Sequence, residues 1–291
     1  MAREIKCTNE DGVSINLTDR FAPWELQTCE GIYEMNCTVN VMDDSMTDGS
    51  IYQGGKVQQR NIVLTLRDSP FADHMANRNL LYNVFRPKRP GVFAYTENGI
   101  TKVIEYEVEK VYIDAVKRAR QATISLICPD PFFRDENEIT VSMSNWEGGF
   151  EFEHEFTAEG EEFGVRNAEM LKSIQNDTAD DIGVKIVISA TGEVTNPAIY
   201  HVEDQTAIRI GTASKHLDME AGDKIIITTH TNNKHVYLMH SGTLTEINNY
   251  LSGDSEFIQI HAGMNTFGYN ADAGAEYISV DIIFQYKYLG V

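Results

Sequence analysis

Carboxylates at alternating positions are the first residues of this chain whose types and spacing could do chemistry. On an extended strand, Glu151, Glu153 and Glu155 share one face, while Phe152 and His154 lie on the other. A glycosidase needs two carboxylates held about 5–10 Å apart across a sugar. A solvated strand face has the same pattern, and the high density of acidic residues in this region favours that interpretation.

Patterns for other kinds of catalysis and for metal binding are missing from the sequence. None of the eight histidines belongs to an HExxH zinc motif, and no GxSxG elbow offers a serine nucleophile. Gly54–Gly55–Lys56 lacks the first glycine of a phosphate-binding loop, the hydroxyl residue after its lysine and the helix that follows. We therefore predict that the protein is not an enzyme, binds no cofactor and has no metal site.

The net charge of −20 is distributed unevenly along the 291 residues. Residues 1–135 contain 16 basic and 19 acidic side chains, a net charge of −3, whereas residues 136–291 contain 8 and 25, a net charge of −17. An acidic surface repels phosphate groups, so we predict no specific binding of nucleic acid and no membrane partner. One basic cluster, Lys117–Arg120, has no interleaved aromatic residues and is interpreted as a solvated turn or a subunit contact.

The step in charge falls within a proline-containing stretch, LICPDPFFRDENEIT, which runs from Leu126 to Thr140. A change of composition at such a turn marks a domain boundary, and the chain is long enough for two domains of about 100–200 residues each. We predict an N-terminal domain over residues 1–135 and a C-terminal domain over residues 136–291.

Five residues of this stretch are predicted to form the seam between the two domains: Pro129, Asp130, Pro131, Phe132 and Phe133. The two prolines fix their backbone φ angles and stiffen the exit from the preceding apolar segment. The two phenylalanines offer large apolar side chains for packing. We favour this packed turn over a catalytic loop, because the sequence contains no other catalytic pattern.

The N-terminal half has mainly the pattern of strands. Mixed β-branched, apolar and polar residues predict strands at Ile32–Met42, Gln59–Leu66, Val103–Asp114 and Ala122–Cys128. The alternation in the third of these slips near Glu105, which indicates a bulge. A stretch rich in glycine and aspartate between Met42 and Val57 predicts a long, flexible hairpin or lid.

One segment, Asp68–Arg86, has the pattern of an amphipathic helix instead. Ser69 is a suitable N-cap and Pro70 fits the first helical position. One apolar face is approximated by Phe71, Met75, Leu81, Tyr82 and Phe85. Prolines follow at positions 87 and 90, where they end the helix.

The C-terminal half is a succession of short strands separated by turn signals. The predicted strands are Gly183–Ser189, Pro197–Val202, Thr206–Ile210, Asp223–His230, His235–Met239, Phe257–Ile260 and Tyr277–Tyr286. Asn232–Asn233 indicates a tight hairpin between two of them, and Arg166–Gln175 suggests a helical turn. Many evenly spaced strands without helices predict a β-sandwich.

Aromatic residues of the C-terminal half leave a ligand-binding alternative open. The candidates for stacking on sugars are Trp146, Tyr200, Tyr237, Tyr250, Tyr269 and Tyr277. Aromatic side chains at strand spacing more often belong to a core, and that interpretation is favoured. A carbohydrate-binding accessory module is therefore the second hypothesis for the function, and an acid-rich glycoside hydrolase is the third.

Short motifs follow one another along the chain in a distinctive order. They are Gly49–Gln53, Arg60–Leu64, the helix that runs into Phe85–Pro87, Ser125–Cys128, Asp130–Phe133, Ile174–Asn176, Ile186–Ile188, Asn196–Ile199, Ala221–Ile227 and Ala262–Asn265. This order resembles the distal tail protein family of long-tailed phages, over roughly residues 13–291. The resemblance implies a mainly β fold, with an N-terminal β-sandwich or split-barrel domain that contains one α-helix. A C-terminal β-sandwich similar to galectins and carbohydrate-binding modules would follow it.

The resemblance also implies a function as a structural virion protein. N-terminal domains of such proteins form a homohexameric ring, the hub that joins the tail tube to the tail tip or baseplate. The expected partners are other copies of the chain, the tail tube protein, a tail-tip hub protein and a receptor-binding protein. The expected location is the tail of the virion, assembled in the cytoplasm of the bacterial host.

Overall fold

The computed structural model describes residues 3–19, 21–43, 48–69, 73–114, 120–148, 164–168 and 171–291, and its fold is mainly β, as predicted. The chain divides into two compact units: the first unit comprises Met1–Glu136 and Lys287–Val291, and the second unit comprises Asn137–Tyr286. The predicted boundary after Asp135 lies one residue away, but the prediction places the last five residues in the C-terminal domain. They belong to the first unit because β26 (Lys287–Tyr288) pairs with β10 (Phe133–Asp135).

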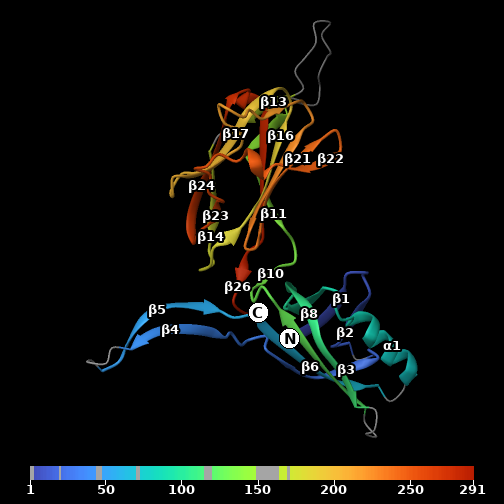
Figure 1. Ribbon diagram of the computed structural model, residues 1–291. Helices are drawn as coiled ribbons and strands as arrows, with labels where there is room; N and C mark the ends of the chain where they lie inside the picture. Colours follow the sequence, from blue (N-terminus) through green and yellow to red (C-terminus); the bar gives the residue numbers. More distant parts are fainter. Residues whose placement is uncertain are drawn as a thin grey trace, which may run out of the picture. The chain divides into compact units, whose positions relative to one another are not determined.

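The first unit is built on one nine-stranded antiparallel sheet (Figure 1). The main path runs in the order β2-β1-β7-β8-β9-β6-β3, and β10 joins β26 to β8. The strands are β1 (Arg3–Asn9), β2 (Ser14–Asn16), β3 (Trp24–Glu30), β6 (Arg60–Asp68), β7 (Gly91–Glu97), β8 (Ile100–Asp114) and β9 (Gln121–Cys128). Alternating residues of β6, namely Ile62, Leu64 and Leu66, are fully buried in the core of this unit.

A separate two-stranded ribbon, β4 (Cys37–Asp43) and β5 (Ser50–Val57), extends away from this sheet (Figure 1). It confirms the hairpin expected between Met42 and Val57. The strand expected over Ile32–Met42 is wrong in its first half, because strand structure starts only at Cys37. The carbonyls of Ile32 and Glu34 accept hydrogen bonds from a buried arginine instead of pairing in a sheet.

The bulge of β8 lies further along the strand than the sequence suggests. The register against β9 shifts between Val108 and Lys110, not near Glu105. Ile104, Tyr106 and Val108 are buried, so the period of two is intact through position 105. The predicted slip arises from taking Val103 as an inward-facing residue.

The helix α1 (His74–Val84) is confirmed, but it starts after the predicted N-cap. Asp73 caps it, since its carboxylate accepts a hydrogen bond of 2.9 Å from the backbone N–H of Met75. Ser69 is not the cap, because it lies four residues before Asp73, and its own N–H donates to Pro23 O. Leu81 is buried as predicted, whereas Met75 is 63% exposed, and Pro70 and Phe71 lie outside the described residues.

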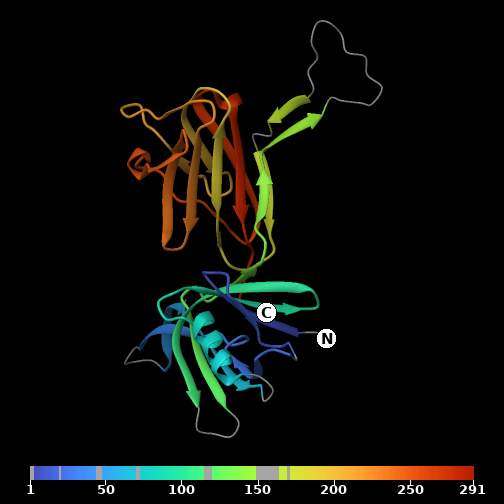
Figure 2. The same ribbon diagram turned by 90° about the vertical axis from the view of Figure 1, so that its right-hand side faces the viewer.

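The second unit contains two larger antiparallel sheets, which Figure 2 shows from the side. The six-stranded sheet has the order β11-β25-β16-β20-β21-β22, and the five-stranded sheet has the order β14-β24-β17-β18, with β19 beside β17. Their bounds are β11 (Ile139–Ser142), β14 (Leu171–Asn176), β16 (Lys185–Ala190), β17 (Val194–His201), β18 (Thr206–Arg209), β19 (Asp218–Met219), β20 (Lys224–His230), β21 (Asn233–His240), β22 (Thr243–Glu246), β24 (Gly263–Ala273) and β25 (Ile278–Phe284). The remaining elements are β12 (Ser144–Gly148), β13 (Gly164–Ala168), β15 (Ile182–Gly183), β23 (Gln259–Ile260), η1 (Asn248–Tyr250) and η2 (Ala275–Tyr277).

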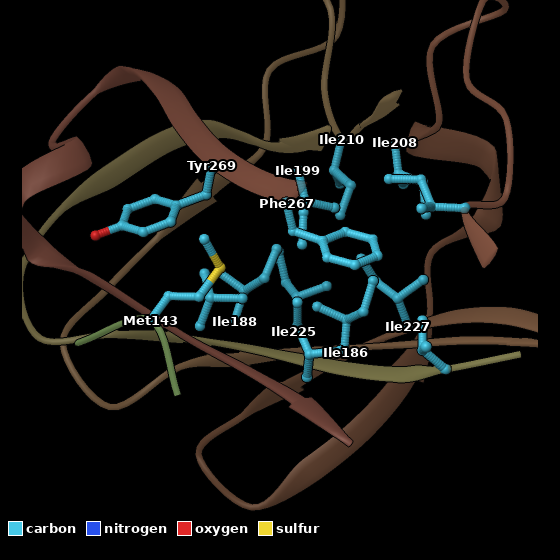
Figure 3. Close-up of a cluster of buried hydrophobic side chains, with 14 of the residues drawn as sticks. Met143, Ile186, Ile188, Ile199, Ile208, Ile210, Ile225, Ile227, Phe267 and Tyr269 are labelled. Atoms are coloured by element: carbon cyan, nitrogen blue, oxygen red, sulfur yellow. The ribbon is translucent and has the colours of Figure 1, made fainter. Parts of the chain in front are cut away.

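The core of the second unit lies between these two sheets, as a β-sandwich requires (Figure 3). Ile199, Phe267 and Tyr269 come from β17 and β24, and they face Ile186 and Ile225 of the opposite sheet. All five side chains are at most 2% exposed. The predicted β-sandwich is therefore confirmed.

Two local predictions of the second unit have opposite outcomes. The hairpin at Asn232–Asn233 is confirmed, because Asn232 has a φ of 63° in the turn between β20 and β21. The helical turn at Arg166–Gln175 is wrong, since this segment contributes to β13 and β14. In β14, Ile174 and Asn176 are buried in alternation, so the pairing with β24 decides the local structure.

Candidate interaction surfaces

The five predicted seam residues lie in the first unit, around β10. Phe133 is fully buried in the core of that unit, and its ring lies 6.4 Å from the ring of Phe93 between centroids. Phe132 is partly buried, with the Lys287 ammonium 5.4 Å from its ring centroid. The role of these residues as a seam stays a prediction.

The turn before these phenylalanines is held by its own polar groups. Asp130 accepts a hydrogen bond from the backbone N–H of Phe132 at 3.3 Å and pairs with Arg134 at 2.5 Å. Pro131 offers its carbonyl to Arg60 at 2.9 Å. These contacts fix the chain direction between β9 and β10, consistent with a packed turn.

Arg60 is a buried guanidinium at the start of β6. It is 3% exposed and donates hydrogen bonds to five backbone carbonyls, those of Gly31, Ile32, Glu34, Pro131 and Leu289, at 2.5–2.9 Å. Among the residues that the structure describes, no carboxylate pairs with it. Burial lowers the pKa of this guanidinium from its ordinary value, yet the carbonyl oxygens satisfy its donors.

The same guanidinium connects three segments that are distant in sequence. Its carbonyl acceptors belong to the loop that leads into β4, to the turn before β10 and to the end of the chain. Arg60 also lies over the Phe133 ring, 5.0 Å from its centroid. The sequence does not predict that this arginine connects three segments, because it shows only an arginine beside an apolar strand.

The ribbon of β4 and β5 presents a surface of unusual composition, which we call the apolar ribbon. Five large apolar side chains on it are 48–66% exposed: Val39, Val41, Met42, Ile51 and Tyr52. Val41 pairs directly with Tyr52 and Met42 with Ile51, so apolar side chains occupy both faces. An isolated two-stranded hairpin is marginally stable in water, so such a surface is suited to cover by another chain.

Buried and exposed histidines gather at one end of the five-stranded sheet. His201 is 1% exposed, and its Nδ1 lies 2.9 Å from Asp204 Oδ2, while its Nε2 contacts Asn265 Oδ1 at 3.1 Å. His261 lies between Asp181 and the same Asp204, with both contacts at 2.8 Å. Burial disfavours the charged imidazole, but the two carboxylates outweigh it and raise the pKa of His261 above its ordinary 6.5.

This arrangement predicts a pH-dependent contribution to stability. Because the folded-state pKa of His261 is raised, its stabilisation is fully present below about pH 6.5 and is lost as the pH rises through the folded value. The side chain is 42% exposed, so the contribution is less than about 1 kcal/mol. Chemical denaturation of wild type and His261→Gln should differ more at pH 5.5 than at pH 8. The pH-dependent part of that difference should shrink when Asp181→Asn is the background, and an equal difference at both pH values would contradict the prediction.

The histidines do not form a metal centre in the part of the chain that the structure describes. No group of three or more His, Cys, Asp or Glu side chains in these residues is placed to bind a metal ion. The carboxylates Glu151, Glu153 and Glu155, and residues 117–119 of the predicted basic cluster, lie outside the described residues. In the described ranges, no helix is long and apolar enough to cross a membrane.

The candidate sugar-stacking aromatics separate into core and surface residues. Tyr269 is 2% exposed and belongs to the core of the second unit, as the favoured interpretation predicts. Tyr277 is 45% exposed, and Tyr250 is partly buried beside the Lys215 ammonium, 3.8 Å from its ring centroid. Tyr200 is partly buried and lines a hollow on the face of the five-stranded sheet that is turned away from the core.

Of the comparisons with known proteins, the one with solved structures finds matches. No family model and no curated protein matches the sequence. The Dit protein of phage SPP1, described as a paradigm of the hub adsorption apparatus in phages that infect Gram-positive bacteria, matches with a TM-score of 0.67 and 11% identity. The match covers 98% of this chain and 99% of that chain.

A second set of matches comes from the baseplate of phage P2 in its activated conformation. A chain of the baseplate structure with Ca matches with a TM-score of 0.58 and 12% sequence identity. A chain of the baseplate structure with Sr matches with a TM-score of 0.56 and 13% sequence identity. Both matches cover 100% of this chain and 100% of the other. Over its whole length, the chain therefore has the fold of the phage Dit hub protein, as its sequence resemblance to distal tail proteins predicts.

Proposed function

We propose that this protein is a structural component of a phage tail, the hub that joins the tail tube to the tail tip or baseplate. First units of several copies associate side by side into a ring, for which six copies are expected from the family resemblance. The tail tube protein, a tail-tip hub protein and a receptor-binding protein are its proposed partners. The protein acts by assembly, and we assign it no catalytic activity.

The observation that carries this proposal is the apolar ribbon on a chain with the Dit fold. Val39, Val41 and Tyr52 are each more than 50% exposed, an arrangement that is costly in water unless another surface covers it. A second copy of the chain is the occupant we favour. A ribbon that reaches from each copy to the next would generate a closed ring by repeated head-to-tail contacts.

The distribution of charge supports contacts through first units. The first unit carries a net charge of −3 and the second unit one of −17. Like charges repel over a Debye length of about 8 Å at physiological ionic strength, so close packing of second units is disfavoured. First units, with a net charge of −3, repel one another much less and can therefore pack closely.

The proposal predicts that charge on the apolar ribbon prevents assembly. The double variant Val41→Asp/Tyr52→Asp places two carboxylates on one face of the cross-strand pair, where an interface would bury them unpaired. We expect wild type to form rings with a central hole by negative-stain microscopy at high protein concentration. The variant should be monomeric by mass photometry, with its association constant at least about 100-fold lower.

A matched control adds the same charge to the second unit. Val202 and Leu244 are 44% and 53% exposed, and Val202→Asp/Leu244→Asp should assemble as wild type does. Circular dichroism should give each variant a wild-type spectrum. Wild-type protein that stays monomeric at every concentration and salt, with and without tail tube protein, would refute the ring.

A further inference from the structure

A trough crosses the outward face of the five-stranded sheet in the second unit. We call it the outer trough and define it by Asn196, Ala198, Tyr200, Arg209, Asn270 and Asp272. Alternate residues of the same strands, such as Ile199 and Tyr269, point into the core, so this row points away from it. The hollow measures about 340 Å³, within the roughly 300–1,000 Å³ of small-molecule sites.

The register of the sheet explains why the surface is hollow here. Ala198 of β17 stands between Arg209 of β18 and Asn270 of β24. A methyl group flanked by two longer polar side chains forms a floor with two walls. Tyr200 closes one end, and at the other end Asn196 Nδ2 donates to Asp272 Oδ2 at 2.8 Å.

The tyrosine at the end of the trough lies across a neighbouring strand. Tyr200 pairs with Gly268 of β24, and a Cβ atom at position 268 would lie 2.3 Å from the tyrosine ring. The ring therefore occupies the space of the missing side chain. This placement of the ring requires glycine at position 268, and part of the ring surface remains exposed.

The polar groups of the trough include both donors and acceptors, with nearly balanced charge. Arg209 already pairs with Asp254, which neutralises its charge but leaves guanidinium donors available. Asp272 uses one oxygen for Asn196, so its other oxygen can accept. Asn270 is exposed; its Oδ1 already accepts a hydrogen bond of 2.9 Å from the backbone N–H of Ala271, and its Nδ2 remains able to donate.

Other classes of ligand fit these groups less well. An anion would meet a paired arginine in a unit of net charge −17. A metal ion would find a single carboxylate in the trough, and an apolar ligand would cover the polar side chains of Arg209, Asn270 and Asp272. A neutral sugar matches the set, since the C–H face of a pyranose stacks on an aromatic ring and its hydroxyls need donors and acceptors together.

We propose that the outer trough binds a neutral saccharide, with Tyr200 as the stacking platform and Arg209, Asn270 and Asp272 as hydrogen-bond partners of its hydroxyls. This site is independent of ring formation by the first unit. A hollow of about 340 Å³ suits one hexose ring and part of a neighbour.

Saturation-transfer difference NMR on the full-length protein tests the proposal. The probes are the methyl glycosides of glucose, galactose, N-acetylglucosamine and rhamnose, each at up to about 10 mM. Wild type should transfer saturation to at least one of them, strongest at the C–H protons that face the ring. Tyr200→Ala should weaken binding about tenfold, and Arg209→Gln, which retains the tyrosine, should also weaken it.

A matched tyrosine provides the control. Tyr277 also lies over a glycine, since a Cβ on Gly192 would meet its ring at 2.8 Å, but it lies outside the trough. Tyr277→Ala should bind as wild type does. Absence of transfer to all four glycosides, or equal transfer in wild type and Tyr200→Ala, would overturn the proposal.

Discussion

Arg60→Met should lower the free energy of unfolding of the first unit by about 3–5 kcal/mol. The substitution keeps much of the apolar stem but removes the donors of five carbonyls, and a buried carbonyl without a partner costs about 1–3 kcal/mol. Structural relaxation and the entry of water would restore some hydrogen bonds to these carbonyls. The total loss of stability is therefore smaller than five times the cost of one unsatisfied carbonyl. Arg60→Lys should be almost as harmful, because three donors on one nitrogen cannot reach three separate segments.

Hydrogen exchange is the appropriate measurement, since it reports on each unit separately. Protection of the peptide that contains β9 should fall in the variant, while peptides of β16 and β20 in the second unit keep theirs. Arg67→Met is the matched control on the same strand: its side chain is 47% exposed and lies 3.9 Å from Glu25. Its effect should stay below about 1 kcal/mol. A similarly small effect for Arg60→Met would show that the carbonyls find other partners.

Phe133→Ala should be comparably destabilising, by about 3–5 kcal/mol. The side chain is fully buried, contacts Phe93 edge to face and supports the Arg60 guanidinium, so the substitution leaves a cavity beneath a buried charge. Chemical denaturation followed by exchange protection of β6 and β9 would measure the loss.

The neighbouring phenylalanine provides the comparison for this experiment. Phe132 is only partly buried and its ring lies beside the Lys287 ammonium, so Phe132→Ala removes less buried apolar surface and should cost less than half as much. If the two variants were equally destabilised, Phe133 would not be the principal apolar anchor of this turn. If neither changed the stability, the core assignment of Phe133 would be wrong.

Much of the fold could be predicted from the sequence because its signal is local. Alternation in Val103–Asp114 and Lys224–His230 records which side chains enter a core, and a period of two identifies a strand without knowledge of its partner. The helix at His74–Val84 is likewise visible in its amphipathic pattern. The exact N-cap is not visible in that pattern, since Ser69 and Asp73 are both good capping residues and the structure starts the helix at His74.

The candidate sites depended on contacts between distant residues, which a sequence pattern does not contain. The hydrogen bond from Arg60 to Leu289 spans 229 positions. The outer trough joins β17, β18 and β24, and it exists because position 268 is a glycine opposite Tyr200. Tyr200 is one of six aromatic candidates in the sequence, and only the register of the sheet separates it from the buried Tyr269.

The pairing of β10 with β26 makes the second unit an insertion into the first. Its two chain connections leave from adjacent positions, since Arg134 lies opposite Lys287 in that antiparallel pair. A turn of a few residues is enough to join such neighbouring strands. Any compact domain whose own ends lie close together could take the place of residues 137–286 without breaking the sheet. The first unit can thus keep its own sheet and core while the inserted domain changes.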